Sequence, residues 1–178
     1  GYNLSTLVMG TQTGTHVDAP YHFSNTGETI DNMELDFFLG DAVVVRVTEK
    51  KADEAITMED IEPYKNDITE GKVVLFNTNW YKKRGTEEFF HHPYVNGEVA
   101  KFLVDKGIRF IGIDTINADQ TGGTEFPVHD LFSEKRLMIG ENWAFFDKID
   151  FENPYVIALP MKLVGCDGSP VRAIAVQW

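Results

Sequence analysis

The chain has 178 residues, 43% of them hydrophobic, and its 28 acidic and 16 basic residues give a net charge of −12. This length supports one domain, residues 1–178, with a full hydrophobic core, and the apolar content excludes a disordered protein. The acidic excess repels phosphate backbones, so we expect no nucleic-acid partner. No run reaches the roughly 18 apolar residues of a membrane span, so we expect no membrane partner either.

Runs of apolar or alternating residues predict strands at 4–9, 42–47, 73–76, 110–113, 155–159, 162–164 and 173–176. A helix is predicted to start at Thr57, a second to run from Asn96 to Gly107, and a third to cover 128–135. Strands outnumber helices, and only one or two βαβ units are visible. This pattern indicates a mixed α/β fold on a mainly β core, and not a doubly wound sheet.

The segment 12–22, QTGTHVDAPYH, concentrates polar side chains of the kind that bind metals. In an extended strand His16 and Asp18 leave the same face, because side chains alternate with a period of two. A glycine before them permits a sharp turn, and a proline after them fixes φ. With Gln12 and His22 nearby, the segment predicts a convergent polar site that could hold a metal ion.

His129 and Glu141 form the second group of candidates. Each lies in an apolar stretch, and a carboxylate such as Glu141 is costly to bury without a partner. Taken singly, His129 fits a structural role and Glu141 fits an ion pair. Combined with His16 and Asp18, they supply two imidazoles and two carboxylates, which are enough for one or two divalent ions.

The remaining candidates have simpler interpretations. His91 and His92 are adjacent in a loop and predict solvated side chains rather than ligands. Asp114 ends a predicted strand, where α/β proteins often place functional groups, and Asp119 equally fits a turn. Core packing is the first interpretation of the aromatic residues that could also wall an apolar pocket, Tyr2, Phe23, Trp80 and Trp143.

Cys166 is the only cysteine. A single thiol excludes an internal disulfide and a paired-cysteine zinc site, and it fits a reducing, cytoplasmic location. It lies in the turn-like stretch 164–168, so we interpret it as structural rather than as a nucleophile. The sequence contains no glycine-rich phosphate loop and no nucleophile elbow.

Several segments resemble those of one known family. The signature HxGTHxDxPxHF is matched by GTHVDAPYHF at 14–23, and further landmarks follow in the family's order at 27–31, 112–115 and 168–173. His129 and Glu141 fall where the family has a distal His and a distal Glu. The chain therefore resembles, over nearly its whole length, the metal-dependent cyclase/hydrolase family that includes bacterial kynurenine formamidase and isatin hydrolase.

The resemblance implies an α/β fold of the swivelling β/β/α type and a hydrolase that cleaves an amide, formamide or cyclic amide or ester bond of a small molecule. The implied metal ligands are His16, Asp18, His129 and Glu141. His22 is implied to be the general acid/base beside the metal. The implied cofactor is a divalent metal, zinc first and manganese second, and the implied assembly is a homo-oligomer, a dimer or a tetramer. We expect the family's N-terminal segment to be missing, since the chain starts at Gly1 and not at Met.

One position departs from the family signature. Its first His is replaced by Gln12, whose amide oxygen is a weaker donor than imidazole and shifts the balance slightly towards manganese. Gln12 stays a candidate metal ligand, and two alternatives remain open. One is a non-haem iron oxygenase that uses His16, Asp18 and His129, because these supply two imidazoles and one carboxylate. The other is a non-catalytic protein that binds a metal or a small molecule.

Overall fold

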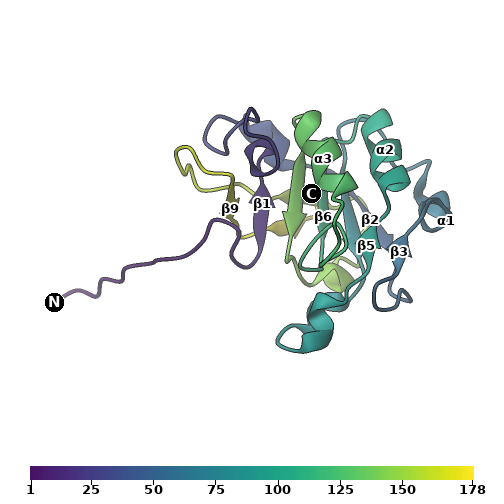
Figure 1. The fold of residues 1–178 in the computed structure, drawn as a ribbon, viewed down its shortest axis with the longest axis horizontal. Coiled ribbons are helices and arrows are strands. Elements are labelled where there is room, and N and C mark those ends of the chain that lie inside the picture. The colour runs from purple at the N-terminus through teal and green to yellow at the C-terminus, as the bar shows by residue number, and fades with distance from the viewer.

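The computed structural model describes residues 1–178, and an eight-stranded mixed sheet forms its centre (Figure 1). The strands are β1 His16–Asp18, β2 Leu39–Arg46, β3 Ala55–Ile56, β4 Val73–Asn77, β5 Tyr94–Val95, β6 Phe110–Ile113, β7 Met138–Glu141, β8 Tyr155–Ile157, β9 Gly168–Pro170 and β10 Ile174–Val176. The α-helices are α1 Met58–Ile61, α2 Gly97–Asp105 and α3 Pro127–Glu134. Short 3-10 helices are η1 Pro20–His22, η2 Leu35–Phe38, η3 Glu62–Tyr64, η4 Trp80–Lys83, η5 Glu87–Phe90 and η6 Phe146–Lys148.

The large sheet has a parallel centre and antiparallel ends. Its strand order is β10-β8-β2-β4-β6-β7-β1-β9, and β3 pairs with β5 in a separate small sheet. Strands β2, β4, β6 and β7 run parallel, while β8 and β10 at one end and β1 and β9 at the other are antiparallel to their neighbours. The predicted mixed α/β fold on a mainly β core is therefore confirmed.

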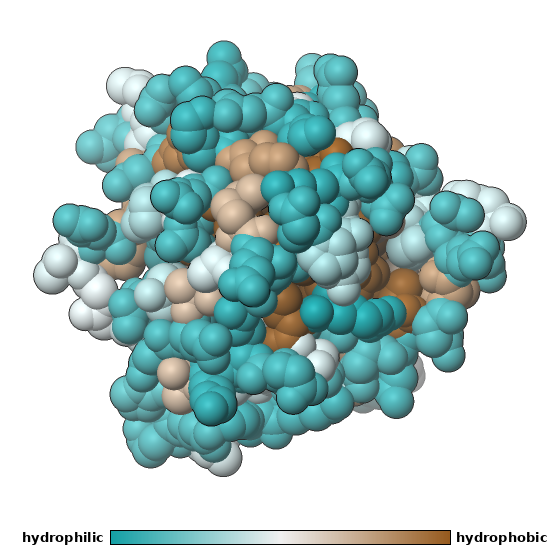
Figure 2. All heavy atoms as spheres, turned by 90° about the vertical axis from the view of Figure 1, so that its right-hand side faces the viewer, coloured by the Kyte–Doolittle hydropathy of each residue, from teal (hydrophilic) through white to brown (hydrophobic).

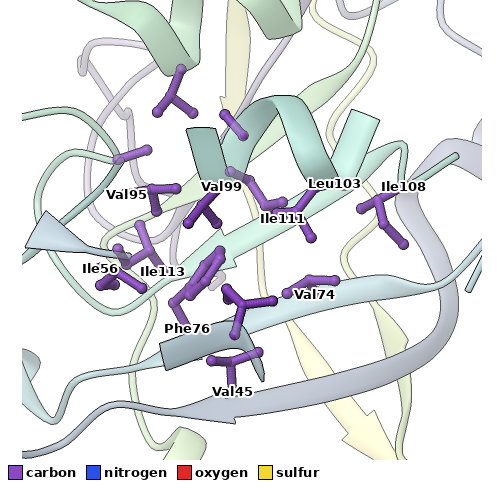
Figure 3. Close-up of a cluster of buried hydrophobic side chains, with 14 of the residues drawn as sticks. Val45, Ile56, Val74, Phe76, Val95, Val99, Leu103, Ile108, Ile111 and Ile113 are labelled. Atoms are coloured by element: carbon purple, nitrogen blue, oxygen red, sulfur yellow. The ribbon is translucent and has the colours of Figure 1, made fainter. Parts of the chain in front are cut away.

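Two hydrophobic cores lie on the two faces of this sheet. Val74 and Phe76 of β4 belong to the first core with Ile111 of β6 and with Val99 and Leu103 of α2 (Figure 3). The intervening residues of β4 enter the second core on the opposite face, because side chains alternate along a strand. All three α-helices contribute buried side chains to the first core, so we call its side the helix-covered face.

The predicted helix ends are confirmed and have clear local causes. At the start of α1, the backbone N–H and the hydroxyl of Thr57 both donate to Oδ2 of Asp60, at 2.7 and 3.0 Å. At the start of α2, Oδ1 of Asn96 accepts a hydrogen bond from the N–H of Glu98 at 2.7 Å. Beyond its end, Gly107 has φ of +78°, a left-handed conformation that glycine adopts without steric cost.

Two of the predicted strands are wrong. Residues 4–9 form an extended arm that leaves the body of the molecule (Figure 1), with Leu4 84% and Val8 96% exposed. The arm has no neighbouring strand, and a strand needs one to pair its backbone groups. Residues 162–164 form a turn instead, in which the N–H of Leu163 donates to the carbonyl of Met161.

Strands β7 and β9 of the large sheet, like the two-residue strands β3 and β5, lack a predicted counterpart. Each of β7 and β9 contains a glycine that the local packing requires. A Cβ on Gly140 would lie 2.8 Å from the indole of Trp143. A Cβ on Gly168 would lie 2.6 Å from the carbonyl oxygen of Val17 and from Nε2 of Gln12. In a sequence, glycine and proline indicate turns. The glycines that close packing requires in β7 and β9 therefore gave a turn signal, and these two strands were not predicted.

The surface adds two observations. The longest α-helix, α2, has nine residues, and no helix of the structure is long and apolar enough for a membrane crossing. The face that carries α1 and β3 is mostly hydrophilic, and apolar side chains show there only between polar ones (Figure 2).

Candidate metal centre

The predicted ligands of β1 and β7 meet where these two strands pair. The register places His16 directly opposite Glu141, and Asp18 follows two residues along β1. Val17, between them, belongs to the second core, so His16 and Asp18 point to the helix-covered face. His129 reaches the same point from α3, and all four side chains are buried, with exposures between 3% and 6%.

These four side chains form one compact cluster. Nε2 of His16 lies 3.4 Å from Oδ1 of Asp18 and 3.6 Å from Oε2 of Glu141. Nε2 of His129 lies 3.5 Å from Oδ2 of Asp18 and 3.2 Å from Oε1 of Glu141. The structure therefore brings together residues that are more than a hundred positions apart in the sequence.

The two imidazoles of the cluster each bond through Nδ1 to an oxygen atom outside the cluster. Nδ1 of His16 lies 2.7 Å from the carbonyl oxygen of Gly14, and Nδ1 of His129 lies 2.6 Å from Oδ2 of Asp119. These oxygens only accept, so Nδ1 carries the donated proton in each ring. The Nε2 atoms then face the carboxylates, as in metal sites where an outer acceptor fixes the tautomer of the ligand.

The cluster attracts positive charge. Burial lowers the pKa of His16, but Asp18 and Glu141 outweigh it and raise the pKa to about 10. Burial likewise opposes protonation of His129, whose pKa is held well above its ordinary value by Asp119 and the same two carboxylates. Burial raises the pKa of Glu141, yet the two imidazoles bring it well below its ordinary value. With neutral imidazoles the two carboxylates carry two negative charges, which one divalent cation neutralises.

The donor set fits a metal ion because its central carboxylate has unused oxygens. Neither oxygen of Asp18 has a hydrogen-bond partner, although both are fully buried. A buried carboxylate without donors is costly unless a cation compensates it. Asp18 is also shared by two groups whose ligand atoms lie within 4.8 Å of one another, one with His22 and His129 and one with His16 and Glu141. The arrangement supports the binding of a divalent metal.

His22 and Gln12 lie at the exposed rim of the cluster. Nδ1 of His22 lies 2.8 Å from Oδ2 of Asp167, and its side chain is 29% exposed. Nε2 of Gln12 donates to the same Oδ2 at 3.0 Å, whereas its Oε1 is buried without a partner. The amide nitrogen is thus turned to Asp167, and only Oε1 remains free to act as a metal ligand.

Two carboxylates that support the cluster were not singled out for this role in the sequence. Asp119 accepts from the N–H groups of Val128 and His129, each at 3.0 Å, as well as from the ring of His129, so it fixes the start of α3. Asp167 lies in the turn before β9, where only its position beside Gly168 in the closing landmark gave a signal. Burial raises the pKa of Asp167, but hydrogen bonds from its neighbours, Gln12 first, lower it to about 2.

Asp114 has a structural role outside the cluster. Its carboxylate accepts from the N–H and the hydroxyl of Thr78, at 2.9 and 2.5 Å, and from the N–H of Asn79 at 2.8 Å. Burial raises its pKa despite these donors. Asp114 therefore ties the loop after β4 to the end of β6.

The two adjacent histidines behave differently from each other. His91 is exposed and pairs with Asp53 at 3.1 Å, as predicted for a solvated loop residue. The prediction is wrong for His92, which is 1% exposed and lies between the carbonyl of Pro93, at 2.8 Å from its Nδ1, and the hydroxyl of Thr121, at 2.7 Å from its Nε2. Burial lowers the pKa of His92, so the structure favours its neutral form.

The aromatic residues divide between the core and the site. Trp80 and Trp143 are buried, and the indole N–H of Trp143 donates to the carbonyl of His16 at 2.9 Å. Tyr2 lies on the exposed arm, so core packing is a wrong prediction for it. Phe23 is 37% exposed and stacks on His129 with ring centroids 4.3 Å apart, which places it at the mouth of the cluster.

Comparison with known proteins identifies relatives of the whole chain. A family model described as putative cyclase matches residues 3–120. Kynurenine formamidase from Bacillus cereus (strain ATCC 14579) is 33% identical over 173 residues, which cover 97% of this chain and 79% of the relative. The chain belongs to the Cyclase family.

Solved structures share the fold of this Cyclase-family chain. Isatin hydrolase A from Labrenzia aggregata, bound to benzyl benzoate, has a TM-score of 0.86 and 28% identity, and the match covers 94% of this chain and 74% of that one. A predicted metal-dependent hydrolase from Bacillus stearothermophilus has a TM-score of 0.78 and 30% identity, with coverage of 94% and 78%. The cyclase-like fold predicted from the resemblance is confirmed.

Proposed function

We propose that this Cyclase-family protein hydrolyses an amide, formamide or cyclic amide or ester bond of a small molecule, with zinc as its metal. It is a metal-dependent hydrolase of C–N bonds, and kynurenine formamidase and isatin hydrolase are among its relatives. The observation that carries the proposal is the buried cluster, in which two anchored imidazoles face the unpartnered carboxylate of Asp18.

The proposed ligands of the metal are His16, Asp18, His129 and Glu141, with Oε1 of Gln12 as a further oxygen donor. Imidazole and carboxylate donors suit zinc, and an added amide oxygen is also tolerated by manganese. When bound there, a divalent ion supplies Lewis acidity that polarises a carbonyl and lowers the pKa of water towards about 7.

His22 is the proposed proton carrier. One of its ring nitrogens lies with the ligand atoms of Asp18 and His129, and Nδ1 is occupied by Asp167. In amide hydrolysis a water oxygen forms the new C–O bond, and His22 takes one proton from that water. When the C–N bond breaks, the same imidazole returns the proton to the leaving nitrogen, which gives a carboxylic acid and an amine. Imidazole is the side chain most often used for such transfers.

Aromatic side chains at the mouth of the cluster favour a substrate with an aromatic part. Phe23 lies 5.0 Å from His22 and 5.4 Å from Phe126, measured between ring centroids. A partly exposed aromatic pair beside the reacting groups would stack on an aryl ring and exclude water from one side. An aryl formamide or an aryl-fused lactam is therefore the substrate class to test first.

The test is metal analysis combined with a hydrolysis screen. Protein stripped with a chelator is reloaded with zinc or manganese and assayed on an aryl formamide, a lactam, a lactone and a cyclic imide. We expect metal to be retained and hydrolysis to depend on it. No retained metal, and no hydrolysis with either ion, would contradict the enzyme. If Gln12→His created activity where wild type has none, the chain would be a binding protein.

The iron oxygenase is the second candidate, because the structure does bring His16, Asp18 and His129 together. An oxygenase site of two imidazoles and one carboxylate would not use Glu141 as a ligand. Yet Oε1 of Glu141 lies 3.2 Å from Nε2 of His129, within the same cluster. Assays with and without oxygen decide between the two. Hydrolysis that proceeds equally under nitrogen supports the hydrolase, and oxygen-dependent turnover with iron would overturn it.

We also infer a homo-oligomer, a dimer or tetramer, and a cytoplasmic location. Exposed apolar side chains on the arm, Leu4 and Val8 among them, offer surface that a second copy could cover. The lone Cys166 forms no disulfide and fits a reducing compartment. Light scattering of the purified protein tests the assembly, and a mass of one chain would contradict it.

A further inference from the structure

Asp167 holds the ring of His22 at its Nδ1 atom. Its Oδ2 lies 2.8 Å from Nδ1 of His22 and accepts from Nε2 of Gln12 at 3.0 Å. Its Oδ1 accepts from the hydroxyl of Thr11 at 2.6 Å. Three side chains from the segment before and within η1 therefore converge on one carboxylate.

The chemistry of these contacts fixes the proton on His22. A carboxylate oxygen accepts, so Nδ1 of His22 must donate its N–H to Asp167. Nε2 of Gln12 also lies 3.3 Å from Nδ1 of His22, but both atoms are donors and do not bond to each other. In the neutral ring the lone pair is then on Nε2, the atom on the opposite side from Asp167.

The carboxylate is itself held firmly in place. The carbonyl of Asp167 accepts from the N–H of Ala19 at 2.9 Å, and Gly168 pairs with Asp18 between β9 and β1. The missing side chain of Gly168 leaves the space that the amide of Gln12 fills, since a Cβ there would meet Nε2 at 2.6 Å. This contact is therefore built into the pairing of the two strands.

We infer that Asp167 is a positioning residue for His22, and that Gln12 acts through its amide nitrogen as part of this network. The inference rests on the proposed hydrolysis for its catalytic consequence. Asp167 keeps Nε2 of His22 free to take the proton of water and stabilises the ring while it holds that proton. The residue that departs from the family signature thus supports the acid/base group, beyond any contact of its oxygen with a metal.

The decisive variant is Asp167→Asn in the zinc-loaded protein. We expect kcat to fall by roughly 10²–10⁴-fold, the usual contribution of an acid/base group, while KM and the zinc content stay near wild type. In nitrogen NMR spectra recorded where the ring is neutral, His22 should show protonated Nδ1 in wild type and a mixture of tautomers in the variant. An unchanged tautomer, or an unchanged kcat, would overturn the inference.

Asp31→Asn is the matched control. Asp31 anchors the same turn by accepting from the N–H of Gly165 at 2.9 Å, but it does not touch His22. A merely structural role of Asp167 would make both variants alike, so we expect Asp31→Asn to keep the wild-type tautomer and kcat. If Asp31→Asn lost as much activity as Asp167→Asn, Asp167 would have no special role.

Gln12→Ala and a double variant complete the test. Gln12→Ala should shift the tautomer of His22 in the same direction as Asp167→Asn, but less, because Asp167 remains. Adding Asp167→Asn to His22→Ala should cost no further activity, since residues that act as a unit are not additive. If no substrate is hydrolysed, the proposed function fails, and the NMR tautomer still decides whether Asp167 positions His22.

Discussion

The site has a deep half and a rim that are built differently. The deep half, His16, Asp18, His129 and Glu141, is buried and set by the pairing of β1 with β7 under α3. The rim, Gln12, His22 and Asp167, is part-exposed and comes from turns held by a few hydrogen bonds. Strand pairing fixes the positions of the deep-half side chains, so a substitution there is poorly tolerated. Residues of the rim are held by side-chain hydrogen bonds, and one hydrogen-bonding side chain can replace another. The departure from the family signature, at Gln12, falls in the rim.

The largest effect is expected in the deep half, at Asp18. Asp18→Asn removes the carboxylate common to both groups of ligand atoms. We expect loss of zinc uptake and a fall in kcat/KM of at least roughly 10³-fold, more than the 10- to 100-fold typical of an outer partner. Metal analysis and kinetics measure it. Asp130→Asn, an exposed change on α3, is the control, and equal losses in both would contradict a metal role for Asp18.

The next effect concerns the support of the deep half. Asp119→Asn takes a charged acceptor from the ring of His129 and from two N–H groups at the start of α3. We expect zinc affinity to fall by roughly 10- to 100-fold, and the free energy of unfolding to fall by about 1–2 kcal/mol, as for a lost helix cap. Chelator competition and urea unfolding measure these. Glu125→Gln, an exposed change, is the control. If Asp119→Asn kept the zinc affinity of wild type, His129 would not need its hydrogen bond to Asp119.

A substitution within β7 tests whether the pairing of β1 with β7 determines the positions of the deep-half side chains. Gly140→Ala puts a Cβ 2.8 Å from the indole of Trp143, which also bonds the carbonyl of His16. We expect a loss of about 1–3 kcal/mol in the free energy of unfolding, typical of overpacking, with weaker zinc binding. Gly10→Ala, where the nearest atom is 3.5 Å away, should be near neutral. If Gly140→Ala kept the wild-type free energy of unfolding, Trp143 could move aside without cost, which would contradict the expected overpacking.

The smallest effect lies outside both halves, at His92. Burial lowers its pKa, so below about pH 6.5 the unfolded chain binds a proton that the folded chain resists. The free energy of unfolding should therefore fall from pH 7 to pH 5, and less steeply in His92→Gln. Urea unfolding at several pH values, with chelator in both samples, measures the difference. Parallel curves for the two proteins would contradict a neutral buried His92.

The predictions from sequence succeeded where the determining interactions are local. The apolar runs of β4 and β6 and the caps at Thr57 and Asn96 depend on neighbouring residues, and all were found. The strand at residues 4–9 was wrong because a strand depends on a partner that the pattern of one segment cannot reveal. The burial of His92 was missed because Thr121, which bonds it, is 29 residues away.

For the candidate site, the sequence by itself determined the residue types and the two-residue spacing that puts His16 and Asp18 on one face. It also showed, through the family signature, which distant His and Glu to expect. Only the tertiary structure decided that Asp119 holds the imidazole of His129, that Asp167 holds the imidazole of His22, and that the amide of Gln12 faces a carboxylate. Those contacts join segments distant in the chain, and a hydrogen bond of that kind depends on packing that no local pattern encodes.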